Sequence, residues 1–299
     1  MKRTAALLAL VLAGGGTAAG GEQQAAPTCP ERWPTWATDD PQNGYPAWSP
    51  NGRELAFSSN RSGRSQIYVL RAADCAVRQV TSHAAGGWQP DWSPEGRRIV
   101  FVGDREEDLW IVGADGKGLR RITRGERPDY DPAWSPDGRK IAFRRGSPPG
   151  SLYVIRPTGG GLRMLRAGSG PAWSRNGRFL AFVGPDDATW VMRADGTGRQ
   201  RITSRVGNGD QDVEWAPDGR RLVIAGSTER GSLTLFVKDL RRGPRRHLRA
   251  SGNGYAPDWS PSRLIAFMRP TADNAEDVFV IQPDGRGLRR LTVAPGITN

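Results

Sequence analysis

The sequence predicts an all-β fold, a six-bladed β-propeller made of four-stranded antiparallel blades. The first observation behind this is a repeat: a segment similar to "DPAWSPDGRKIAF", at 131–143, occurs six times along the 299 residues. The repeats are anchored by tryptophans spaced 44, 42, 39, 42 and 44 residues apart, namely Trp48, Trp92, Trp134, Trp173, Trp215 and Trp259. A regular period near 40 residues is the signature of a repeat architecture.

Each repeat also holds four short runs of strand-forming residues, which is the second observation. In the third repeat the tryptophan is followed by the turn "SPDG" and the runs "KIAFRR" and "SLYVI". A second turn, such as "ADG" at 114–116, leads to a fourth run, such as "GLRRIT" at 118–123. Pro, Asp and Gly in these positions are typical of tight turns. Four strands in one repeat make a propeller blade; a solenoid is the alternative, although it does not require a four-strand unit.

The sequence predicts three segments along the chain. Residues 1–19 are typical of a signal peptide, because Lys2 and Arg3 precede an apolar run, 5–13, that is too short to span a membrane. Residues 20–43 form an N-terminal extension, and residues 44–299 form the propeller, with blades starting near 46, 90, 132, 171, 213 and 257. We therefore expect an exported protein, periplasmic or extracellular; an uncleaved N-terminal anchor is the alternative.

The six repeat tryptophans are interpreted as structural residues. Each is predicted to lie on the first, innermost strand of its blade and to fill the space beside the neighbouring blade. A ring needs the same packing at every junction, and a large aromatic side chain contributes strongly to it.

The repeat resembles the WD-like repeats of the TolB-like six-bladed β-propeller family. The first repeat, "PAWSPNGRELAFSSNRSGRSQIYVLRAADCAVRQVT" at 46–81, is similar to that family's repeat throughout, and the resemblance covers about 44–293. It implies an exported, non-catalytic binding propeller that mediates protein–protein contacts in the cell envelope. The family's namesake carries an N-terminal α/β domain, which we expect to be lacking here, because few residues separate the signal from the first blade.

The formal charge of the chain is +12, and almost all the positive residues are arginines. Because these arginines recur with the repeat, we favour a dispersed, solvated basic surface; attraction to an anionic cell-wall polymer is the alternative. We expect a monomer whose partner is an envelope or extracellular protein, with no nucleic acid and no stable membrane insertion.

A candidate binding surface lies at the mouth of the central channel. The loops between second and third strands vary from repeat to repeat, whereas the loops of the opposite face are short and alike, so binding is expected on the varied face. The residues that lead into the inner strands share that face: Tyr45, Trp88, Gln89, Tyr130, Asp131, Gln211, Asp212 and Tyr255. Aromatic side chains are good contact residues; loop packing between blades is the alternative.

The sequence offers little catalytic chemistry. It has two histidines, placed in different repeats, and no G-x-S-x-G motif. We expect no enzyme activity and no cofactor or metal; the alternatives are a carbohydrate-binding propeller, or a lyase or glycosidase that uses carboxylates at the channel mouth. The spacings "DYD" at 129–131 and "DQD" at 210–212 could hold calcium, although hydrogen bonding to backbone amides is the favoured interpretation.

The two cysteines, Cys29 and Cys75, predict a disulfide, because an even pair in an exported protein is usually oxidised. Two thiols are the alternative. If the bond forms, reduction of the purified protein should lower its free energy of unfolding by about 2–4 kcal/mol. Thermal melts with and without reductant test this, and an unchanged melting temperature would contradict the bond.

Overall fold

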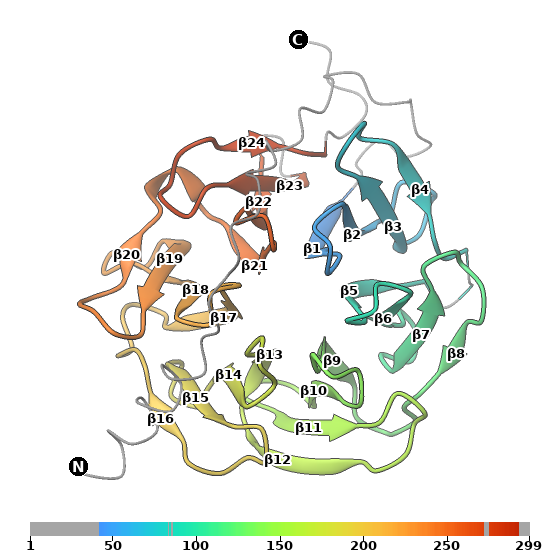
Figure 1. The fold of residues 1–299 in the computed structure, drawn as a ribbon, viewed down its shortest axis with the longest axis horizontal. Coiled ribbons are helices and arrows are strands. Elements are labelled where there is room, and N and C mark those ends of the chain that lie inside the picture. The colour runs from blue at the N-terminus through green and yellow to red at the C-terminus, as the bar shows by residue number, and fades with distance from the viewer. Residues whose placement is uncertain (1–41, 83, 85, 272–274, 293–299) are drawn as a thin grey trace.

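The chain folds into a ring of six antiparallel sheets, which confirms the predicted fold class (Figure 1). The computed structural model describes residues 42–292 except 83, 85 and 272–274. The predicted signal peptide, Cys29 and almost all of the N-terminal extension lie outside the described residues. Over the described part of the chain, no helix is long and apolar enough to cross a membrane.

Each sheet consists of four strands that follow one another in sequence and in space. The inner strands are β1 (Asn43–Trp48), β5 (Trp88–Trp92), β9 (Asp129–Trp134), β13 (Ser169–Trp173), β17 (Asp210–Trp215) and β21 (Tyr255–Trp259). The second strands are β2 (Glu54–Ser59), β6 (Arg98–Val102), β10 (Ile141–Arg145), β14 (Phe179–Val183), β18 (Arg221–Ser227) and β22 (Ile265–Pro270).

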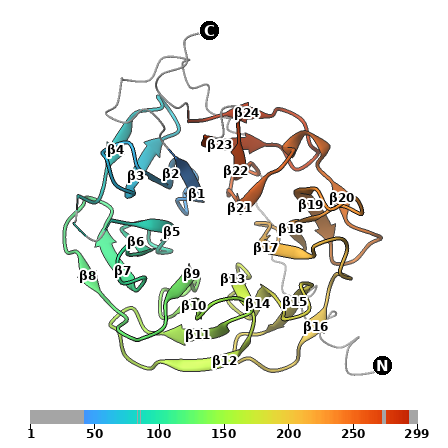
Figure 2. The same ribbon diagram turned by 180° about the vertical axis from the view of Figure 1, so that it is seen from behind.

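The third strands are β3 (Gln66–Arg71), β7 (Leu109–Gly113), β11 (Ser151–Ile155), β15 (Thr189–Arg193), β19 (Leu233–Asp239) and β23 (Glu276–Ile281). The outer strands are β4 (Val77–Gln79), β8 (Arg120–Arg121), β12 (Arg163–Ala167), β16 (Gln200–Arg201), β20 (Arg246–His247) and β24 (Arg289–Arg290). A short 3₁₀ turn, η1 (Arg249–Ser251), follows β20. Seen from either side, the first strand of each blade surrounds the centre and the fourth lies at the rim (Figures 1 and 2).

The Trp-Ser-Pro-Asp-Gly sequence forms the tight turn between the first two strands. In blade 3 the Ser135 hydroxyl bonds the Asp137 carboxylate (2.6 Å), and the Lys140 N–H donates to the same Ser135 oxygen (2.9 Å). Gly138 adopts φ 69° there, which a residue without Cβ tolerates well. Blade 6 lacks this glycine, and Arg263 takes the same conformation with φ 69°.

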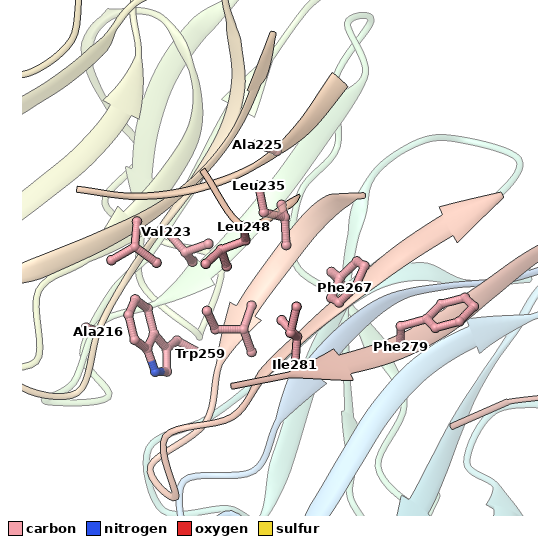
Figure 3. Packing of buried hydrophobic residues seen from close by; sticks show 11 residues of the cluster. Ala216, Val223, Ala225, Leu235, Leu248, Trp259, Phe267, Phe279 and Ile281 are labelled. Carbon is pink, nitrogen blue, oxygen red and sulfur yellow. The ribbon is translucent and has the colours of Figure 1, made fainter. Parts of the chain in front are cut away.

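The hydrophobic core is divided into six clusters, one at each junction between neighbouring blades. Figure 3 shows the cluster between blades 5 and 6, where Trp259 lies beside Ala216 and Val223 of the preceding blade. Trp259 is buried, as are the other repeat tryptophans. Each tryptophan thus fills the junction with the blade before it, which is the structural role expected for it.

The indole N–H groups of these tryptophans fall into two classes. Three donate across the junction to the carbonyl of an alanine in the preceding blade: Trp92 to Ala47 (3.1 Å), Trp173 to Ala133 (3.1 Å) and Trp215 to Ala172 (3.2 Å). The other three, Trp48, Trp134 and Trp259, have no partner for this N–H within the described residues.

The two classes differ in one residue of the preceding blade, the residue just before that blade's own repeat tryptophan. Where that residue is alanine, the indole reaches its carbonyl. Where it is acidic, the indole N–H stays unpaired, and in two of the three cases a carboxylate takes the tryptophan's backbone N–H instead: Trp134 donates to Asp91 (2.6 Å) and Trp48 donates to Asp258 (2.5 Å). A junction can therefore be bridged by a hydrogen bond from an indole N–H or by one to a carboxylate.

Matched substitutions should separate the two classes. Trp92→Phe and Trp48→Phe remove similar volumes from similarly buried sites, but only the first breaks an indole hydrogen bond. A buried hydrogen bond contributes about 1 kcal/mol net, so Trp92→Phe should destabilise the protein by about 1 kcal/mol more than Trp48→Phe. Urea unfolding of both variants measures the difference, and equal losses would show that the indole bond contributes nothing.

Candidate functional site

The inner strands of all six blades surround a cavity of about 220 Å³ on the axis of the ring. Most of its lining comes from the stretch just before each repeat tryptophan, and Trp134, Pro136 and Trp173 complete it. Two levels can be distinguished along that stretch, at the third and at the first residue before the tryptophan.

A β-bulge in every inner strand shapes the first level. At this point five of the six blades have a residue with positive φ: Tyr45 (51°), Gln89 (50°), Asp131 (54°), Gly170 (54°) and Ala256 (46°). For residues with a Cβ this conformation is unfavourable, and it persists only where the surrounding structure holds it. The bulge re-aims these side chains toward the channel.

Asp131 is the most highly bonded residue of this level. Its carboxylate accepts a hydrogen bond from the Gln89 side-chain amide (2.7 Å) and forms an ion pair with Arg144 Nε (2.8 Å). Its backbone N–H donates to the Gln89 side-chain oxygen (2.9 Å). Arg144 thus balances the charge of Asp131, and the two hydrogen bonds between Gln89 and Asp131 join blade 2 to blade 3.

Three carboxylates at the second level, Asp91, Glu214 and Asp258, were not predicted from the sequence. Each immediately precedes a repeat tryptophan, where the other three blades have alanine. This contrast of "DW" and "EW" with "AW" is the signal that could have found them. With Asp131 and Asp212 they put five carboxylates around the cavity. Asp131 pairs with Arg144, which leaves Asp91, Asp212, Glu214 and Asp258.

No described arginine or lysine forms an ion pair with any of these four carboxylates. They accept hydrogen bonds from backbone N–H groups instead, Asp212 from Val213 (2.8 Å) and Glu214 from Trp215 (2.7 Å). Burial raises the pKa of Asp91 and of Asp212 to about 7, with repulsion from Asp258 and Asp131 respectively adding to it. Burial also raises the pKa values of Glu214 and Asp258.

The structure divides the eight predicted mouth residues into two groups. Four of them line the cavity: Tyr45, Gln89, Asp131 and Asp212. The other four lie one residue earlier on their strands and outside that lining: Trp88, Tyr130, Gln211 and Tyr255. The bulge explains the division, since it turns neighbouring residues in different directions.

Three of the aromatic residues form a continuous row beside the cavity. Trp88 meets Tyr45 edge to face, with ring centroids 5.4 Å apart, and meets Tyr130 in the same way at 5.6 Å. All three are partly exposed. Trp88 and Tyr130 also pack on the core between blades 2 and 3, and the Tyr255 hydroxyl donates to Glu276. The rings of this row therefore pack against the blades and still leave part of their surface exposed to solvent.

In the motifs "DYD" at 129–131 and "DQD" at 210–212, the two aspartates have different surroundings. Asp129 accepts two hydrogen bonds from Arg145 (2.6 and 2.8 Å), and Asp210 accepts from Arg245 (2.6 Å); both aspartates are buried. Asp131 and Asp212 line the channel instead. Among the described residues, no group of three or more His, Cys, Asp or Glu side chains is placed to hold a metal ion.

The remaining candidate residues are structural or lie outside the described part of the chain. Cys75 is buried and disulfide-bonded, with φ 57°; because Cys29 is outside the described residues, their pairing stays a prediction. His247 stacks near Phe236 and lies 3.0 Å from the Thr234 hydroxyl. His83 is also outside the described residues.

Comparisons with known proteins agree with this fold. The family model described as TolB beta propeller domain matches residues 35–143. The Tol-Pal system protein TolB of Anaeromyxobacter dehalogenans is 39% identical over 75 residues, which are 24% of this chain and 17% of that protein. The crystal structure of TolB from Acinetobacter baumannii is similar with a TM-score of 0.67 and 14% identity, covering 83% of this chain and 62% of that one. A crystal structure of oligogalacturonate lyase from Vibrio parahaemolyticus is similar with a TM-score of 0.58 and 15% identity, covering 83% and 77%.

The channel carboxylates predict an unusual dependence of stability on pH. Asp212 has a folded-state pKa of about 7, above its ordinary value in the unfolded chain, so folding takes up a proton between about pH 4 and 7. The contribution of Asp212 to stability therefore rises as the pH falls through 7, with a slope of up to about 1.4 kcal/mol per pH unit. Asp212→Asn should raise the melting temperature at pH 8 and flatten the profile between pH 8 and 5.5.

Thermal melts across this range measure the effect. Asp284→Asn is the matched control, because it removes the same charge from an exposed turn. If Asp212→Asn and Asp284→Asn gave the same profile as the parent protein, the Asp212 carboxylate would carry no folding-linked proton.

Proposed function

We propose that this chain, a member of the TolB-like six-bladed β-propeller family, is an exported, non-catalytic binding protein of the cell envelope, periplasmic or extracellular. Its partner would be another envelope or extracellular protein, held at the mouth of the central channel. The observation that carries the proposal is the aromatic row Tyr45–Trp88–Tyr130 at the edge of a carboxylate-lined cavity.

The aromatic row suits a protein contact for energetic reasons. Each ring already touches its neighbour in the unbound protein, so little side-chain freedom is lost when a partner binds. Large aromatic side chains dominate the free energy of protein interfaces, and the partial exposure of these rings leaves area for a partner to bury.

The carboxylates favour a particular polarity in the partner segment. Asp91, Asp212, Glu214 and Asp258 are acceptors without a described cationic partner. Backbone N–H groups or a cationic side chain of a bound segment would be stabilised there.

The family resemblance supports the class of partner. The relative and the structure named TolB are similar to this chain, and one of them is named as a Tol-Pal system protein. Because the aligned segment covers 17% of that protein, the proposal names a class of partner and not a particular one.

A second candidate function is carbohydrate chemistry in the channel. Asp212 has a pKa near 7, which suits a general acid or base at neutral pH, and it lies in the same cavity as Asp131. This candidate requires turnover of a polysaccharide that is lost in Asp212→Asn, whereas a binding propeller would show no turnover.

The binding proposal predicts that two changes at the mouth abolish partner retention without unfolding the protein. Tyr45→Ala is suitable because Ala256 occupies the same bulge position in blade 6 with φ 46°, and Tyr130→Ser is suitable because Ser169 occupies that position in blade 4. In pull-downs from an envelope extract, the double variant should retain at least tenfold less partner than the parent protein. The parent protein should retain the partner at both low and high salt.

Arg175→Ala on the opposite face, where this side chain is exposed, is the control and should bind like the parent. Equal retention of one protein by parent and double variant would contradict docking at the mouth. Retention of acidic polymer by all three proteins, washed away by salt, would favour surface association through arginines.

A further inference from the structure

A second cavity, of about 250 Å³, lies at the junction of blades 3 and 4. It is formed by the end of β12, by β14 and the loop that follows it, by the start of β15, and by the residue before β16. It shares no lining residue with the channel, so it is a separate site.

Two arginines without a described ionic partner face this cavity. Arg166 Cζ lies 5.7 Å from the Phe182 ring centroid, and Arg199 Cζ lies 5.3 Å from that of Trp190. Burial and the nearby Arg199 lower the pKa of Arg166, as expected for cations that repel each other. The one carboxylate in the lining, Asp186, already accepts from Trp190 Nε1 (2.8 Å) and pairs with Arg201 (3.2 Å).

In blades 3 and 5, an arginine stacked on an aromatic ring of its own blade is balanced by a buried aspartate. Arg145 lies 5.3 Å from the Tyr153 ring and pairs with Asp129. Arg245 lies 3.9 Å from the Phe236 ring and pairs with Asp210. These aspartates stand five residues before the repeat tryptophan.

Blade 4 has Gly168 at that position and has no room for an aspartate. A Cβ on Gly168 would come within 2.8 Å of both a Phe182 ring carbon and the Val183 carbonyl oxygen. The negative charge that the repeat supplies in blades 3 and 5 is therefore absent here, although the stacked arginines are present.

Blade packing does not require an arginine at the repeat position of Arg166. In four other blades the corresponding residue is a threonine whose hydroxyl accepts an N–H from the third strand: Thr81, Thr123, Thr203 and Thr292. In blade 3 the backbone pairing continues instead, with Leu152 opposite Arg166 and Ser151 opposite Ala167. The Arg166 side chain therefore does not accept the third-strand N–H that the threonine hydroxyls accept in the other blades.

Arg199 departs from the repeat in the same way. The corresponding residues in blades 2, 3 and 6 are Leu119, Leu162 and Leu288, and two of these pack on the junction cores. Two independent departures from the repeat thus place two cations on one cavity.

We propose that this cavity binds a carboxylate group, which takes the place of the missing aspartate between Arg166 and Arg199. Two guanidinium groups supply paired N–H donors that match the two oxygens of a carboxylate. The Phe182 and Trp190 rings beneath them hold the guanidinium planes in place. The source of the carboxylate is either a small organic acid or an acidic side chain of a peptide.

The test uses the repeat's own residues. Arg166→Thr/Arg199→Leu installs side chains that serve these positions in other blades, so the variant should fold. Arg175→Ala/Arg178→Ala removes the same charge from an exposed turn of blade 4 and is the matched control. All three proteins are titrated by calorimetry with succinate, with inorganic phosphate, and with a five-residue peptide carrying one central aspartate, at constant ionic strength.

The parent and the control should bind a carboxylate probe saturably, and Arg166→Thr/Arg199→Leu should bind it at least tenfold more weakly. Tighter binding of the peptide than of succinate would identify an acidic side chain as the source, and the reverse order would identify a small acid. Tighter binding of phosphate than of either carboxylate, or equal weak responses in all three proteins, would overturn the proposal.

Discussion

The packing of one tryptophan against the preceding blade is the interaction on which the rest of this structure depends. It occurs at all six junctions, and it closes the ring because the cluster between blades 6 and 1 is built like the others. Among the described residues, blade 6 takes all four of its strands from its own repeat. Side-chain packing and the hydrogen bonds from Trp48 to Asp258 and from Asn43 to Asp277 join it to blade 1. A repeat under this constraint has few positions that can vary without cost.

The channel shows how such variation is accommodated. Where alanine precedes the tryptophan, the next blade's indole bonds the alanine carbonyl. Where Asp91 or Asp258 stands there, the carboxylate accepts from the next blade's backbone N–H, and the indole N–H has no partner among the described residues. Carboxylates are therefore brought into the channel by exchanging one junction bond for another. The cost is a buried, unpaired indole N–H, which packing alone does not explain and which is consistent with a functional use of the channel.

The sequence was sufficient for the fold because turn residues, strand runs and tryptophans recur in phase, and every strand followed from the repeat. It was insufficient for the site because of the bulge. "DYD" suggests two carboxylates on one side of a straight strand, but Asp129 bonds Arg145 inside the blade while Asp131 lines the channel. Likewise Tyr130 and Tyr45 were both predicted to lie at the channel mouth, yet of the two only Tyr45 lines the cavity. Asp91 was overlooked because a comparison of repeats, and not of motifs, is needed to see that alanine is its counterpart.

The same comparison explains the arginines, which the sequence alone left divided between a solvated surface and a polymer-binding one. Many of them stack on blade aromatics, among them Arg145 on Tyr153 and Arg245 on Phe236, with buried aspartates as counterions. Their recurrence with the repeat thus reflects a structural cation–π and ion-pair unit, so the number of arginines overstates how many are available to partners, whereas the net charge of +12 already subtracts the paired aspartates. Since the structural arginines are neutralised within their blades, the informative ones are those that are not. Arg166 and Arg199 stack on aromatic rings without an ion pair to a described carboxylate, as Arg269 does on Phe279, and they differ from Arg269 in lining one cavity together.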